Sequence, residues 1–138
     1  MRKVEAGMVA SILDVINSDK SGRVFSCGNT TVDVVHEGVK YTPSYERFIE
    51  VRLHDNLIAR INMVGLPRIT LSDCGYETAT TKSRLNVLFD CFTDECGVHQ
   101  SQHIWYQGND LWSGTVTVPF RHKHPDDCWQ VRQALKLA

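Results

Sequence analysis

Apolar side chains recur every three or four residues in three stretches of the chain, the spacing that places them on one face of an α-helix. The helices predicted from this spacing cover residues 3–18, 80–92 and about 125–136, the last with Pro125 in its first turn. The side chains expected to face the core are Val9, Ile12, Leu13 and Ile16, then Leu85, Leu88 and Phe92, and finally Cys128, Val131 and Leu135.

Between these helices, apolar and polar residues alternate in short runs, which is typical of strands with one buried face. The alternation predicts strands within residues 30–36 and 68–72 and a hairpin over 46–64. It also predicts two later strands, within 98–108 and 111–120, that turn near Gly108.

The register of the predicted 46–64 hairpin can be derived from its apolar side chains, because residues paired across a hairpin share a face. A two-residue turn would place Arg60 on the apolar face, whereas a three-residue turn at 54–56 pairs Val51 with Ala59 and keeps that face apolar. Such a turn requires a left-handed backbone at its third position, so the sequence predicts a positive φ at Asn56.

The order of these elements indicates an α+β fold, with an antiparallel sheet of five to seven strands packed on one face against three helices. Strands do not alternate regularly with helices, which argues against a doubly wound parallel sheet. The 138 residues contain no internal repeat and no obvious linker, so residues 1–138 are expected to form a single domain.

Composition and charge narrow the possible functions. Hydrophobic residues make up 42% of the chain, enough to bury a core. With 15 basic and 16 acidic residues, the overall charge favours neither a nucleic-acid-binding protein nor an acidic mimic of DNA. The five cysteines are an odd number, and no secretory signal or membrane-spanning run is visible, so we expect reduced thiols in a reducing compartment and no membrane association.

Hydroxyl groups and two cations are concentrated at the start of the second predicted helix. Thr80 or Thr81 is expected to cap this helix through its side-chain oxygen. Cations are unfavourable there because a helix start carries partial positive charge, and a bound phosphate or carboxylate would offset that penalty. The candidate anion- or partner-binding site is Thr80, Thr81, Lys82, Ser83 and Arg84, although the same residues also suit an ordinary capped and solvated helix.

Three segments of the chain, GNTTVDV (28–34), VRLHDNLIARI (51–61) and ITLSDCGYETATTKSRLNVLFDCF (69–92), carry a recognisable pattern. They resemble an uncharacterised family of small tailed-bacteriophage proteins, whose pattern contains Leu-His-Gly-Asn-x-Ile-Ala and Gly-Trp-x-Thr-x-Thr-Thr-Lys-x-Arg-Leu-Asn. In this chain Asp55 stands where glycine is usual and Tyr76 where tryptophan is usual.

This resemblance covers about residues 28–92 and leaves the late hairpin and C-terminal helix, about 97–136, outside it. It implies a phage-encoded protein that acts in the cytoplasm of the infected bacterium. It implies no particular activity.

Cysteine and histidine gather in the last third of the chain, and both are ligand types that zinc prefers. Cys91 begins this run, but His99 and His103 would lie about 13 Å apart on an extended strand. Buried cysteine also commonly behaves as a small hydrophobic side chain. We therefore expect no cofactor, with zinc as the alternative and Cys96, His99, His103, His122, His124 and Cys128 as its candidate ligands.

Aromatic residues gather near the predicted late turn. Alternation places Trp105 and Tyr106 on opposite faces, so at least one of them is expected to be exposed or covered by a helix, and Trp112 follows nearby. Exposed aromatic side chains could anchor a partner. The motifs of serine hydrolases, zinc metalloproteases and nucleobase deaminases are absent from the sequence, which favours a binding protein over an enzyme.

Together these features favour a phage accessory protein that binds a host protein or nucleoprotein during host takeover or counter-defence. It would use an open sheet face, the helix start and exposed aromatic residues. Three alternatives remain: a nucleic-acid-binding module with phosphate contacts from Lys40, Arg60, Lys82 and Arg84, a small zinc-dependent domain or enzyme, and a minor component of the virion. The sequence determines neither the partner nor the oligomeric state.

Overall fold

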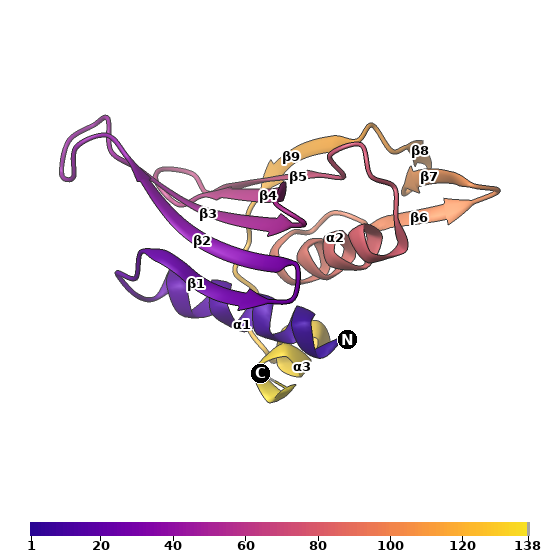
Figure 1. Cartoon of the computed structure of the whole chain (residues 1–138), viewed down its shortest axis with the longest axis horizontal. Coiled ribbons are helices and arrows are strands. Elements are labelled where there is room, and N and C mark those ends of the chain that lie inside the picture. The colour runs from indigo at the N-terminus through magenta and orange to yellow at the C-terminus, as the bar shows by residue number, and fades with distance from the viewer. Residues whose placement is uncertain (138) are drawn as a thin grey trace.

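The computed structural model describes residues 1–137 and contains three helices and two antiparallel sheets (Figure 1). The helices are α1 (Lys3–Ile16), α2 (Ala79–Phe92) and α3 (Trp129–Leu137). The larger sheet has six strands, in the spatial order β1 (Gly22–Cys27), β2 (Thr30–Glu37), β3 (Glu46–Leu53), β4 (Asn56–Asn62), β5 (Arg68–Ser72) and β9 (Thr115–Pro119). The smaller sheet consists of β6 (Val98–Ser101), β7 (Ile104–Gln107) and β8 (Asp110–Leu111).

The predicted α+β architecture is confirmed, since α1, α2 and α3 all lie on the same side of the six-stranded sheet (Figure 1). Side chains from the sheet and from α1 and α2 form one core between these layers. Burial of each large apolar side chain stabilises the fold by roughly 1.5–3 kcal/mol. No helix among residues 1–137 covers the opposite face of the sheet, which carries mostly polar side chains. None of the helices described is long and apolar enough to cross a membrane.

The β3–β4 hairpin differs in detail from the prediction. Its turn consists of His54 and Asp55, with φ of 51° and 65°, and the prediction of a positive φ at Asn56 is wrong. Two left-handed turn residues match the twist of the flanking strands better than the predicted three-residue loop. A bulge at Ile58 then restores the predicted pairing of Val51 with Ala59, so the apolar face remains continuous.

The late strands are shorter and more numerous than predicted. Residues 98–107 form a tight hairpin that turns at Gln102 and His103, whose φ values are 50° and 67°, instead of one strand. The side chain of Asn86 attaches this hairpin to α2, because it donates to the Val98 carbonyl at 2.8 Å and accepts from the Val98 N–H at 2.6 Å. The predicted turn near Gly108 joins β7 to β8.

The C-terminal helix begins later than predicted, at Trp129, and Pro125 lies in the turn that precedes it. Val131 faces the core as expected, but the second buried residue is Ala134, and Leu135 is 48% exposed. The prediction that Leu135 faces inward is therefore wrong. Val131 and Ala134, three residues apart on one face of the helix, form the buried stripe of α3, which packs against α1.

Candidate functional site

A cavity of about 470 Å³ lies between the β3–β4 turn and the start of α2, and we call it the turn–helix cavity. Its lining comes from two of the segments that carry the phage resemblance, 51–61 and 69–92. The lining residues are Leu53, His54, Asn56, Ile58, Asp73, Tyr76, Thr78, Thr80 and Thr81.

The β3–β4 turn forms one wall of this cavity. The backbone N–H of His54 donates to the carbonyl of Asn29 at 2.8 Å, which holds the turn against the neighbouring β1–β2 turn. Asp55 has a φ of 65°, a left-handed conformation that glycine adopts without steric cost. Glycine would therefore suit this position of the turn better than aspartate does.

The loop into α2 forms the other wall and is organised by Asp73. One carboxylate oxygen of Asp73 accepts from the Gly75 N–H at 2.7 Å, and the other accepts from Nε1 of Trp112 at 2.8 Å. The residue that caps α2 is Thr78, whose hydroxyl accepts from the Thr81 N–H at 3.1 Å. The prediction that Thr80 or Thr81 caps the helix is wrong, because the helix begins at Ala79, which makes Thr78 its cap and places Thr80 and Thr81 inside its first turn.

The electrostatics of the cavity are set by a carboxylate. Asp73 is only 6% exposed, and no lysine or arginine of the described residues lines the cavity. Within residues 1–137, the side chains of His54, Asn56 and Thr80 make no hydrogen bond to the protein. The cavity therefore offers unpaired donors and acceptors around one negative charge, and the partial positive charge of the α2 start offsets that charge only in part.

Ser83 and Arg84 of the predicted helix-start cluster are engaged by the protein itself. Nη1 of Arg84 lies 2.8 Å from Oε2 of Glu5, and Nε donates to the Thr30 hydroxyl at 3.2 Å. The Ser83 hydroxyl donates to the same Glu5 oxygen. The Arg84 and Glu5 side chains are 8% and 2% exposed, so this pair belongs to the interior of the fold.

These contacts change the ionisation of Glu5. Burial raises the pKa of its carboxyl, but hydrogen bonds from Ser83, the Arg2 backbone and Arg84 outweigh it, and the pKa of Glu5 lies below its ordinary value.

Of the five residues predicted to bind an anion, Thr80 and Thr81 line the turn–helix cavity and Lys82 is half-buried. Anion binding at this helix start stays a prediction, but the side chains of Ser83 and Arg84 already donate hydrogen bonds to the carboxylate of Glu5.

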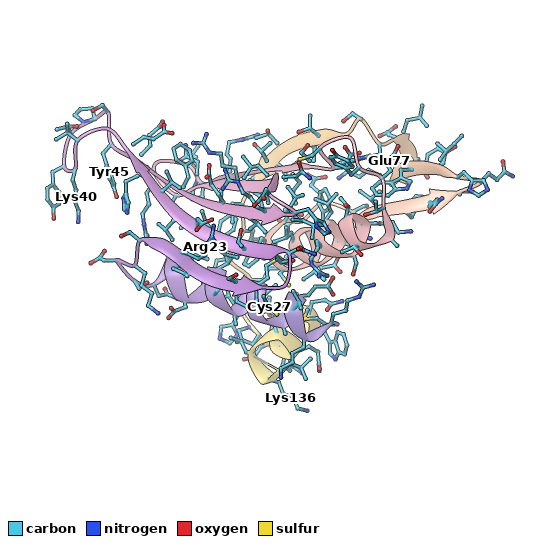
Figure 2. All side chains as sticks on the ribbon, in the orientation of Figure 1. Arg23, Cys27, Lys40, Tyr45, Glu77 and Lys136 are labelled. Atoms are coloured by element: carbon cyan, nitrogen blue, oxygen red, sulfur yellow. The ribbon has the colours of Figure 1, made fainter. Side chains whose placement is uncertain are left out.

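The four cations suggested for phosphate contacts do not come together. Arg84 is buried, and Lys40 lies on the projecting β2–β3 loop at the opposite end of the sheet from Glu77, which belongs to the loop before α2 (Figure 2). Arg60 lies on the sheet face away from the helices, in register with Glu50 and Thr70. A nucleic-acid surface built from all four is therefore not formed.

The candidate zinc ligands fall into separate groups. His122, His124 and Cys128 line a second cavity of about 310 Å³, together with Asp94, Arg121, Lys123 and Asp127. His99 stacks on Tyr106 in the small sheet, with ring centroids 5.7 Å apart. Cys96 is exposed in the loop before that sheet, and His103 is exposed at its tip. In the described part of the chain, no group of three or more Cys, His, Asp or Glu side chains is arranged to hold a metal ion.

The aromatic residues singled out in the sequence mostly serve the fold. Trp105 is 5% exposed, and Trp112 is half-buried with its N–H bound to Asp73. Among residues 1–137, the exposed aromatic side chains are instead Tyr41, Tyr76 and Trp129, at 93%, 57% and 59%.

The sequence analysis did not select Asp73 as a site residue. Its only local signal is the turn-like Asp-Cys-Gly that follows β5.

Comparison with known proteins identifies the family. The sequence matches the family described as Kyanoviridae Gp96 protein over residues 1–126. The chain belongs to this phage protein family. The match includes α1 and the small sheet, so it extends well beyond the 28–92 region expected from the sequence. No functionally curated protein and no solved structure matches this Gp96 family member.

Proposed function

We propose that this Kyanoviridae Gp96 family member acts by binding a host protein or nucleoprotein, and that the turn–helix cavity receives a basic side chain of that partner. The observation that carries this proposal is the lining of the cavity. It combines the buried carboxylate of Asp73 with His54, Asn56 and Thr80, whose side chains have no partner within residues 1–137, and it contains no lysine or arginine of the described chain.

A lysine or arginine side chain fits this lining better than an anion does. Each oxygen of a carboxylate can accept two hydrogen bonds, so Asp73 retains capacity after binding Gly75 and Trp112. A cationic donor would add a charge-assisted hydrogen bond there, whereas an anion would be repelled. Leu53 and Ile58 in the lining would contact the methylene stem of the side chain.

Two exposed carboxylates beside the cavity support the same polarity. Asp55 lies in the β3–β4 turn and Glu77 in the loop before α2, so each flanks one wall of the cavity. Exposed charges of one sign around a binding site raise the association rate of an oppositely charged partner. A basic loop of a host protein, such as one that contacts nucleic acid, has the required chemistry.

Affinity capture from infected cells tests the proposal with the full-length tagged protein and two variants. Asp73→Asn removes the charge and keeps the shape of the side chain, and His103→Ala alters an exposed residue at the tip of the β6–β7 hairpin as a control. We expect wild type and His103→Ala to recover the same partner, and Asp73→Asn to recover it at least about tenfold less, because truncating a buried charged contact costs about 2–5 kcal/mol.

A second measurement ties any captured protein to the cavity. Cross-linking mass spectrometry should place a lysine or arginine of the partner next to the 53–56 turn, and replacing that residue should reduce binding to wild type but not to Asp73→Asn. Equal recovery by Asp73→Asn, with unchanged urea unfolding, would refute the proposal. So would the absence of any reproducible partner. Recovery of the protein from purified virions would assign it to the particle instead.

A further inference from the structure

A shallow hollow of about 250 Å³ lies on the open face of the six-stranded sheet, and we call it the sheet hollow. It spans β3, β4, β5 and β9 and is separate from the turn–helix cavity, with which it shares no lining residue. Its lining consists of Phe48, Arg60, Asn62, Arg68, Thr70 and Thr117.

Arg60 is held in place by its neighbours. Its guanidinium carbon lies 3.6 Å from the centre of the Phe48 ring, and its Nε and Nη2 donate to Glu50 and Glu37, each at 3.0 Å. These contacts fix the position of the guanidinium group before any ligand arrives. They also balance its charge, while the Nη1 group makes no hydrogen bond to residues 1–137.

The remaining lining residues supply hydrogen-bond donors. Arg68 is exposed, and no carboxylate of the described residues lies within 4.0 Å of its guanidinium group. Asn62 uses its side-chain oxygen to accept from the Val64 N–H at 3.0 Å, which leaves its NH₂ group available. Thr70 and Thr117 share one hydrogen bond of 2.8 Å, so one of their two hydroxyl protons remains available as well.

The side chains around the sheet hollow carry a small net positive charge. On the open face, β4, β5 and β9 contribute no acidic side chain. Arg52 and Arg60 together are balanced by Glu37 and Glu50, because Arg52 is also paired with Glu50 at 3.0 Å, so the uncompensated charge beside the hollow comes from Arg68. The hollow therefore offers several donors and about one net positive charge.

We propose that the sheet hollow binds one phosphodiester group of a single-stranded nucleic acid. A phosphodiester carries a single negative charge, which matches one uncompensated guanidinium, whereas a phosphate monoester carries about 1.5 to 2 charges at neutral pH. Guanidinium, amide and hydroxyl donors are the groups that contact nucleic-acid phosphates. The hollow opens onto the exposed sheet face, so a strand can enter and leave it on either side. This site does not depend on the turn–helix cavity.

The test uses a fluorescently labelled thymidine decamer with the full-length protein, titrated at several salt concentrations. We expect weak binding that falls with salt, with a slope of log K against log salt of about −0.7, as expected for one phosphate contact. Arg68→Gln should weaken binding at low salt by at least about fivefold and bring the slope closer to zero by about 0.7. Nuclear magnetic resonance should show the largest shifts at Arg68, Thr70 and Thr117.

Arg23→Gln is the matched control, because Arg23 is an exposed arginine of the same sheet that is paired with Asp33 on the far strands β1 and β2. It should bind like wild type. Equal loss in Arg23→Gln and Arg68→Gln would overturn the proposal, since it would indicate unspecific attraction to the whole face. Absence of binding at 20 mM salt would overturn it too, as would tighter binding of a phosphoserine peptide than of the decamer. Unchanged urea unfolding of both variants shows that the fold is kept.

Discussion

The first two turns of α2 take part in two polar sites, one open to solvent and one buried in the fold. Thr80 faces the turn–helix cavity, where its hydroxyl has no partner in the described part of the chain, and Arg84 lies under α1, where its guanidinium is paired with Glu5 and Thr30. These two residues are four apart, about 6 Å along the helix axis. Within this short distance, α2 passes from the open turn–helix cavity into the interior of the fold.

The buried site connects three elements that are remote in sequence. Glu5 belongs to α1, Thr30 begins β2 and Arg84 lies in α2, and all three residues are buried. A buried ion pair adds little net stability, because the attraction roughly repays the loss of hydration, but removing one partner leaves an uncompensated charge. The pair therefore fixes how α1 and α2 pack, whereas Thr80 in the turn–helix cavity can be replaced without loss of the fold.

The largest expected effect comes from Arg84→Ala. It leaves the buried Glu5 carboxylate without its cation and should lower the free energy of unfolding by about 3–5 kcal/mol. Urea denaturation followed by circular dichroism measures this. Arg23→Ala, which breaks an exposed pair with Asp33, is the control and should change the free energy of unfolding far less, because solvent screens an exposed pair. Equal effects of the two changes would show that Arg84 is not structural.

A smaller effect should appear in acid. The pKa of Glu5 is lowered in the fold, so its stabilising contribution is present above its ordinary value of 4.5 and is lost as the pH falls through the lowered value. As the pH is lowered from 5, the free energy of unfolding should therefore fall more steeply for wild type than for Glu5→Gln. Parallel pH profiles would contradict the assigned role of this carboxylate.

A third effect distinguishes the helix cap from the cavity. Thr78→Ala removes the hydroxyl that accepts from the Thr81 N–H and should cost about 1 kcal/mol. Thr80→Ala, two residues away, should change stability by less than about 0.5 kcal/mol because its side chain makes no hydrogen bond within residues 1–137. Thermal unfolding of both variants compares them directly. A larger loss in Thr80→Ala would restore the cap to that residue.

The smallest effect has the opposite sign. Asp55→Gly places glycine at a φ of 65° and should raise the free energy of unfolding by about 0.5 kcal/mol, because a left-handed conformation strains a residue that carries a Cβ atom. Chemical denaturation detects the gain. Ala59→Gly, in the same hairpin but within a regular strand, is the control and should destabilise. A loss of stability in Asp55→Gly would mean that the Asp55 carboxylate contributes more than the strain costs.

Local patterns were enough to predict much of the architecture. The apolar spacing over 3–18 and 80–92 and the alternation over 30–36 and 68–72 correspond to α1, α2, β2 and β5. These predictions succeed because a period of 3.6 or 2 residues reports directly which face of an element is buried. The 98–107 hairpin was missed because its turn, Gln102-His103, contains none of the usual turn residues.

The candidate sites depended on contacts that no local pattern contains. By itself, the sequence determined the α+β class, the hydroxyl-rich start of α2 and the resemblance to a phage family. Only the tertiary structure paired Arg84 with Glu5, 79 residues away along the chain, and placed Asp73 and His54 in the lining of one cavity. The reason is physical: periodicity encodes which side of an element is buried, but the partner of a charged side chain is set by which elements fold together, and that is decided by the packing of the whole core.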